Sequence, residues 1–74
     1  MTIHKIIGPN GVMPELCNGG TCPTALLVDN EDVVIQGYIL TSDELAQLKG
    51  PAGEGFLKMP RAVFERIAHH VLTS

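Results

Sequence analysis

Hydrophobic residues cluster in two runs near the middle of the chain, residues 25–28 and 32–40, with the polar residues 29–31 between them. Both runs are rich in valine, isoleucine and leucine, and two such runs around a short polar turn are typical of an antiparallel hairpin. Residues 2–7 have similar character and end at the turn formers of residues 8–11, which predicts a further strand. From these patterns we expect a small antiparallel sheet of three to four strands.

The second of these runs is apolar on both faces, because successive side chains in a strand point to opposite sides. One side would carry Val33, Ile35 and Ile39, and the other Val34, Tyr38 and Leu40. A strand of this kind belongs in the middle of a covered sheet or faces a partner. We therefore take Val34, Tyr38 and Leu40 as the candidate interface. Gly37 interrupts the run, and we expect a bulge there, with a close backbone approach as the alternative.

Two helices are predicted after the hairpin. Thr41 suits the N-cap of a short helix, and Glu44, three residues later, suits the reciprocal bond of a capping box. Pro60 fits the first position of an amphipathic C-terminal helix. The apolar stripe of that helix consists of Phe64, Ile67, Ala68 and Val71, with Val63 at its edge. We expect the C-terminal helix to cover one face of the strand at 33–40.

Residues 12–23 and 49–55 are predicted loops, since proline, glycine and other turn formers dominate them. Together with the sheet and the two helices, they indicate an α+β fold. The chain has 74 residues, far fewer than the roughly 250–300 at which chains divide into separate cores. We therefore expect one domain, residues 1–74.

Composition and charge exclude some classes of function. Lysine and arginine number only five, the formal net charge is −3, and aromatic residues make up 4% of the chain. Nucleic-acid binding depends on clustered basic residues and, for single strands, on exposed rings, so we expect no direct contact with nucleic acid. The longest apolar runs are far shorter than the ~20 residues that span a membrane. With no apolar leader at the N-terminus, we expect a cytoplasmic protein that does not enter membranes.

Cys17 and Cys22 flank four residues, two of them glycine, in the most distinctive segment of the chain. Three arrangements are open: reduced thiols near a loop, a reversible disulfide, or half of a metal site completed by histidines. The spacing differs from the Cys-x-x-Cys of redox enzymes and zinc ribbons. His69 and His70 would point about 100° apart on a helix. We therefore expect no bound metal and no cofactor, and we keep Cys17 and Cys22 as a candidate redox pair.

The sequence also lacks the residue patterns of an enzyme. It contains no Gly-x-Ser-x-Gly elbow, and its two serines are Ser42, beside the predicted cap, and Ser74. The glycine-rich residues 50–55 do not end in Gly-Lys-Ser/Thr and precede a predicted strand, which excludes a phosphate loop. We therefore expect no catalytic residues.

One resemblance follows from the order of these elements. The segment Cys-Asn-Gly-Gly-Thr-Cys, then a hairpin, and finally a short strand that leads into an amphipathic helix is similar to small actinobacterial proteins of the BldB-like type. The matching regions are residues 17–37 and 56–67, roughly half of the chain. The family typically has an Asn-Cys-Val-Glu-Val-Ala strand, whereas in this chain Pro23 and Thr24 follow the second cysteine. Phe64 also stands where the family has a tryptophan.

The resemblance implies a regulatory role but carries over no catalytic residues. BldB-like proteins are domains of unknown function that are often encoded beside helix-turn-helix regulators. We therefore expect a small non-enzymatic regulatory or protein-interaction module, either homodimeric or bound to a transcription regulator. The alternative is a thiol-based redox or metal-responsive protein that uses Cys17 and Cys22.

Overall fold

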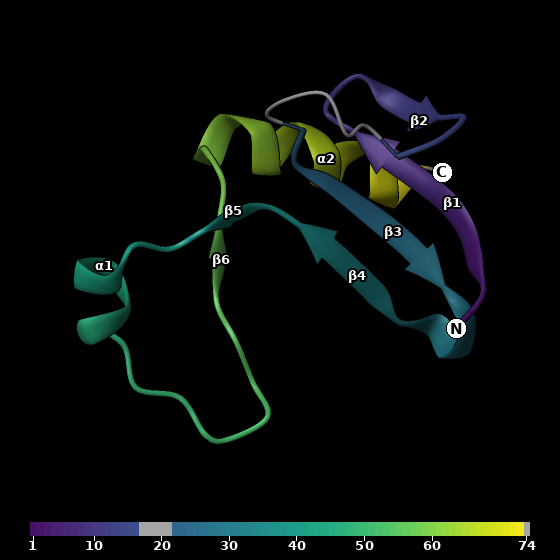
Figure 1. Cartoon of the computed structure of the whole chain (residues 1–74). Helices are drawn as coiled ribbons and strands as arrows, with labels where there is room; N and C mark the ends of the chain where they lie inside the picture. The colour runs from purple at the N-terminus through teal and green to yellow at the C-terminus, as the bar shows by residue number, and fades with distance from the viewer. Residues whose placement is uncertain (17–21, 74) are drawn as a thin grey trace.

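A four-stranded antiparallel sheet is the main element of the computed structural model, which describes residues 1–16 and 22–73 (Figure 1). Its strand order is β2-β1-β3-β4. The strands are β1 (Ile3–Gly8), β2 (Gly11–Met13), β3 (Thr24–Val28) and β4 (Val33–Gln36). A separate two-stranded sheet pairs β5 (Tyr38–Ile39) with β6 (Leu57–Lys58). The helices are α1 (Ser42–Ala46) and α2 (Arg61–Thr73), and the predicted α+β fold is confirmed.

The β1–β2 hairpin was not predicted, because residues 12–23 were expected to form a loop. Ile7 pairs with Val12 and Gly8 with Gly11 across this hairpin. Gly11 has φ of 120°, a backbone conformation that side chains with a Cβ rarely adopt. The dipeptide Asn10-Gly11 is a common hairpin signal and could have identified this turn from the sequence.

The β3–β4 hairpin forms where the sequence predicts it. Leu26 pairs with Val34 and Ala25 with Ile35. A short 3₁₀ turn, Asp29–Glu31, connects the strands, and Asn30 and Glu31 both have φ of 61°. Left-handed conformations at both central positions suit the right-handed twist of a tight hairpin.

The prediction of one continuous strand over residues 32–40 is wrong. The chain leaves the four-stranded sheet after Gln36, and Tyr38 and Ile39 pair instead with Lys58 and Leu57. Gly37 lies at the break, and a Cβ added to it would be 2.9 Å from the backbone oxygen of Lys58. The glycine therefore permits a close approach between two backbone segments.

Replacing Gly37 with alanine is expected to open the contact between β5 and β6. The new methyl group would overlap a backbone oxygen, and overpacking of this kind costs typically about 1–3 kcal/mol. We expect the β5 and β6 amides to exchange with solvent roughly tenfold faster or more, as measured by hydrogen–deuterium exchange. Gly55→Ala is the control, because a Cβ there meets nothing within 4 Å. Equal exchange in both variants would contradict the steric explanation.

Helix α2 packs on one face of the sheet, chiefly over β1, β2 and β3 (Figure 1). Ile67 is buried against Ile7 and Ala25, which form the centre of the core. The expectation that α2 covers β4 is wrong, and Phe64, expected in the buried stripe, is 54% exposed. The reason lies in the position of β4: it is an edge strand, whereas α2 lies over the middle of the sheet.

Residues 37–59 form an arm that leaves the end of β4 and returns to the start of α2. It contains β5, α1, a long loop and β6, and Figure 1 shows it standing away from the sheet with α1 at its far end. The radius of gyration is 13.2 Å, compared with about 11 Å for a compact chain of this length. The arm therefore adds mainly surface, and Met59, where the arm meets α2, packs against the core.

Candidate interaction surface

The outer edge of β4 is open. Within the described part of the chain, β4 pairs with β3 on one side and with no strand on the other. Val33, Val34 and Ile35 are 48%, 38% and 39% exposed. Proteins usually protect such an edge with a charge, a proline or a bulge, because its unpaired backbone groups attract other strands. The sequence Val-Val-Ile-Gln contains no charge and no proline.

The opposite edge of the sheet is protected in comparison. Strand β2 has only three residues and is followed by Pro14, which cannot donate a backbone hydrogen bond. Very short strands and prolines are two of the devices that keep an edge from pairing. The two edges therefore differ, and β4 is the one suited to receive a further strand.

An apolar groove separates β4 from α2. It encloses about 260 Å³ and is lined by hydrophobic side chains only. Val33 and Ile35 contribute from β4, and Phe64, Ala68 and Leu72 from α2. The groove exists because α2 covers β1 and β3 but leaves this face of β4 exposed. Sequence reasoning missed this part of the site, since it placed the helix directly on the strand.

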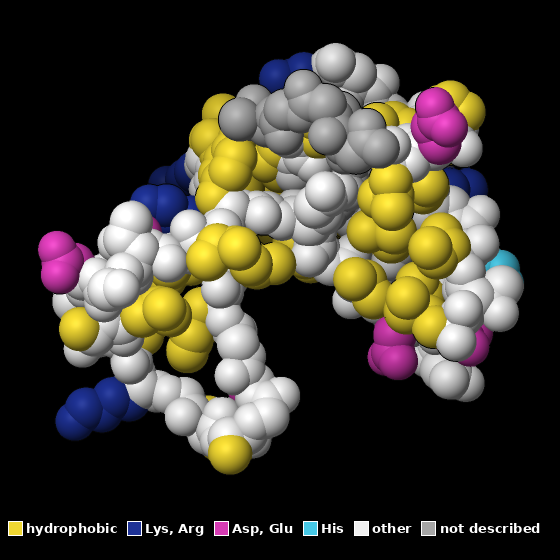
Figure 2. Space-filling model, viewed as in Figure 1, with side chains coloured by type: hydrophobic (Ala, Val, Ile, Leu, Met, Phe, Trp, Pro, Cys, Tyr) yellow, Lys and Arg dark blue, Asp and Glu magenta, His cyan; other side chains and the backbone are white. Residues whose placement is uncertain are grey.

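The other face of β4 presents Val34 beside Leu26 of the neighbouring strand. At the end of the strand, the hydroxyl of Thr24 donates a hydrogen bond of 3.0 Å to the side-chain oxygen of Gln36. Figure 2 shows hydrophobic side chains on this side of the sheet and others on the arm, separated by a hollow. Apolar surface therefore lies on both faces of β4.

The arm carries hydrophobic side chains that its own short elements do not bury. Ile39 is 83% exposed, although it belongs to β5. Four more large hydrophobic residues of the arm are exposed: Leu45, Leu48, Phe56 and Leu57.

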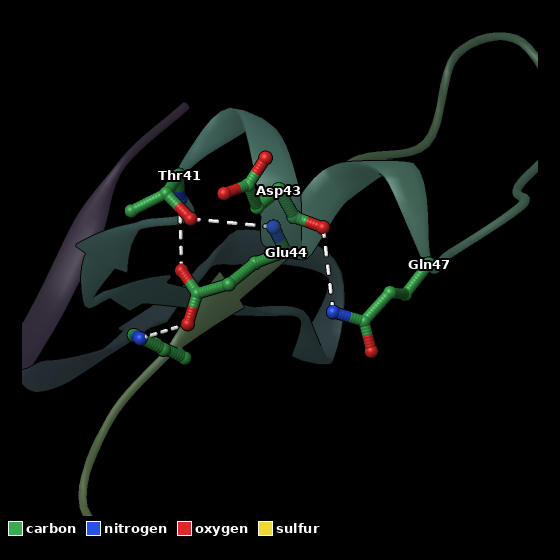
Figure 3. A network of polar contacts seen from close by, with 5 residues as sticks. Thr41, Asp43, Glu44 and Gln47 are labelled. Atoms are coloured by element: carbon green, nitrogen blue, oxygen red, sulfur yellow. Dashed lines mark hydrogen bonds and ion pairs between the residues drawn. The ribbon is translucent and has the colours of Figure 1, made fainter.

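Polar contacts fix the start of α1 within the arm (Figure 3). The backbone N–H of Glu44 donates to the Thr41 hydroxyl at 3.2 Å, and the N–H of Thr41 donates to the Glu44 carboxylate at 2.8 Å. This is the predicted capping box. Lys58 of β6 also donates to the Glu44 carboxylate and so ties α1 to the returning strand. Gln47 donates from its side chain to the carbonyl oxygen of Asp43.

The hydrogen bond from Lys58, followed by that from the Thr41 backbone, holds the pKa of Glu44 below its ordinary value. A carboxylate with a lowered folded-state pKa contributes stability above its unfolded pKa. That contribution is lost as the pH falls through the folded-state pKa.

Glu44→Gln is therefore expected to lower the thermal midpoint at neutral pH, by a difference that shrinks as the solution becomes acidic. The reason is that the wild-type carboxylate becomes protonated there and loses its charge-assisted bonds. Thermal unfolding followed by circular dichroism over a pH series measures this. Asp43→Asn is the control, because it removes a charge from the same turn and leaves the Glu44 contacts in place. A pH-independent difference for Glu44→Gln would contradict the prediction.

The structure separates the three predicted interface residues. Val34 is exposed on β4, whereas Tyr38 and Leu40 are half-buried in the arm. Tyr38 lines a pocket together with Val63 at the start of α2. Val34 is therefore the member of the predicted set that lies on the open edge.

The structure describes one of the two predicted cysteines and both of the neighbouring histidines of α2. Cys22 is half-buried and is not a free thiol, but Cys17 lies outside the described residues, so their pairing stays a prediction. The rings of His69 and His70 meet edge to face with centroids 5.4 Å apart. Within residues 1–16 and 22–73, no group of three His, Cys, Asp or Glu side chains is placed to hold a metal ion.

No helix in that part of the chain is both long and apolar enough to cross a membrane.

Comparison of the chain with protein-family models, with curated proteins and with solved structures finds no match. The resemblance to BldB-like proteins therefore stays a prediction. Any functional conclusion rests on the surfaces just described.

Proposed function

We propose that this chain is a small non-enzymatic protein-interaction module that works in regulation as a homodimer. The observation that carries the proposal is its surface area. The chain exposes 5565 Å², whereas a compact monomer of 7.9 kDa exposes roughly 4,400 Å². The excess is about 1,200 Å², and a stable protein–protein interface buries about 800 Å² on each partner.

The distribution of the buried residues supports the same proposal. Among the described residues, the buried hydrophobic side chains are Ile7, Ala25, Leu26, Val28 and Ile67. So small a core leaves little stability, because a domain of this size buries only about 60% of its unfolded surface. Association would bury further apolar side chains at β4, in the groove and on the arm. Because association favours the folded chain, the dimer would be more stable than the folded monomer.

The chemical character of the surface favours binding over catalysis. The groove beside β4 is lined by hydrophobic residues and brings no nucleophile next to a base. A contiguous apolar surface on a small protein is typical of an interaction site. A regulatory role is consistent with the resemblance to BldB-like proteins. A transcription regulator would then be a further partner of this chain.

Sedimentation equilibrium over a wide range of protein concentration tests the proposal. We expect a mass near twice 7.9 kDa that falls toward the monomer value only on dilution. A monomer at every concentration would contradict the homodimer. Serine at both Cys17 and Cys22 should leave association unchanged. Loss of the dimer in that variant would instead favour the thiol-based alternative.

A further inference from the structure

The open edge of β4 is complementary to itself. Two copies of an edge strand can pair antiparallel about a two-fold axis perpendicular to the sheet. Each residue then lies opposite a residue of the second copy whose side chain is on the same face of the sheet. An axis through Val34 places Val34 opposite its own copy and Val33 opposite Ile35 of the second chain. Every apolar side chain of the strand therefore meets another apolar side chain.

Charge is compatible with this register. Asp32, which precedes the strand, would face the Gln36 amide of the second chain and not another carboxylate. Like charges directly opposite one another destabilise a strand pair, and this register avoids them. An axis through Ile35 would instead place Val34 opposite Gln36, an apolar side chain opposite a polar one. The Val34-centred register is the better match.

The space that a second strand requires is present. The arm stands away from the sheet, and the hollow between the two, with apolar side chains on both sides, leaves the outer edge of β4 accessible (Figure 2). The chain exposes about 1,200 Å² more than a compact monomer of its mass, which is more than one partner buries in a standard interface. An axis perpendicular to the sheet also keeps both α2 helices on the same face. The two apolar grooves would then join into one trough between them.

We propose that two copies of this chain pair through their β4 strands, antiparallel and centred on Val34, to form a continuous eight-stranded sheet. The inference rests on the proposed homodimer and specifies how its subunits meet. The occupant of the open edge is thus the same strand of a second copy.

Cross-linking at a single introduced cysteine tests this arrangement. In a Val34→Cys variant, the two new thiols would face each other across the axis, at Cβ separations of about 4.5–5.5 Å. Oxidised glutathione should therefore convert most of the dimer to a covalent dimer. Val12→Cys is the matched control, because it makes the same substitution on the exposed edge strand β2. The wild-type chain controls for Cys17 and Cys22.

Each outcome bears on a different proposal. A covalent dimer that forms at least tenfold faster with Val34→Cys than with Val12→Cys supports pairing through β4. A dimer in sedimentation that does not cross-link at Val34 overturns the β4 pairing but leaves the homodimer intact. Preferential cross-linking at Val12 or in an Ile35→Cys variant overturns it as well, in favour of the other edge or another register.

A Val34→Cys variant that is monomeric while the wild type is dimeric shows that Val34 contributes to association. In that case Val34→Ser under the same conditions tells whether the cause is loss of the valine or a mixed disulfide between the new thiol and glutathione, and either cause places residue 34 at the interface.

Discussion

Ile67→Ala is expected to remove most of the folding stability of the protein. Ile67 is only 3% exposed and packs against Ile7 and Ala25 at the centre of the core. Removing such a side chain costs typically about 2–5 kcal/mol, from lost burial and from the cavity that remains. Small domains have a total stability near the lower end of about 5–15 kcal/mol. The substitution therefore removes most of the margin.

Urea unfolding followed by circular dichroism at a fixed protein concentration measures this loss. The concentration must be fixed because association adds to the apparent stability of a dimer. Val12→Ala on strand β2 is the control, since Val12 is 63% exposed and lies outside the groove beside β4. Its effect should stay within about 0.5 kcal/mol, as is usual for surface positions. Similar losses in both variants would show that the core is not centred on Ile67.

Those elements of the fold that depend on neighbouring residues could be predicted from the sequence. The β3–β4 hairpin follows from two apolar runs around a polar turn, and the start of α1 follows from Thr41 and Glu44. Both rest on interactions between residues close in the chain. Helix α2 was predicted for the same reason, although it begins at Arg61 and Pro60 provides the first carbonyl acceptor.

Features that depend on distant residues could not be predicted in the same way. The break at Gly37 is set by the carbonyl of Lys58, and no local pattern reveals that contact. Because both faces of β4 are apolar, two alternatives were open: a place in the middle of a covered sheet, or contact with a partner. Apolar residues on both faces indicate that something must cover a strand, but not whether the cover comes from the same chain. Residues 1–16 and 22–73 of one copy leave that requirement unmet.

The candidate site also combines a feature that follows from neighbouring residues with one that depends on distant residues. Val34 was predicted as an interface residue because it lies on the face away from the helix. Val33 and Ile35 were missed, since the helix was expected to cover them, and only the position of α2 over the middle of the sheet reveals the groove. The side of a strand on which a residue lies could be read from alternation, whereas its exposure depends on where the helix packs.

Val34→Lys is expected to convert the dimer to a monomer and to weaken association by about a hundredfold or more. In the β4 pairing, each copy would place its lysine opposite the lysine of the other, so two like charges are buried together. A hundredfold loss corresponds to about 2.7 kcal/mol, within the range for central interface residues. The monomer should still fold, because an exposed edge lysine can extend into solvent and natural edges often carry one.

Sedimentation equilibrium together with circular dichroism separates lost association from lost folding. Val12→Lys on strand β2 is the matched control and should remain dimeric. A Val34→Lys chain that is folded and still dimeric would show that the edge of β4 is not part of the interface. An equal loss in both variants would indicate a general effect of added charge.

Mixing Val34→Lys with Val34→Glu should restore a dimer that neither variant forms alone. A residue on a two-fold axis faces its own copy, so opposite charges meet only when one chain of each kind associates. Opposite charges across a strand pair are favourable, whereas like charges are not. We expect the mixed dimer to be at least about tenfold tighter than either homodimer, measured by sedimentation of equimolar mixtures. If the mixture remains as monomeric as its components, the two Val34 side chains do not face each other, and the axis lies elsewhere along β4.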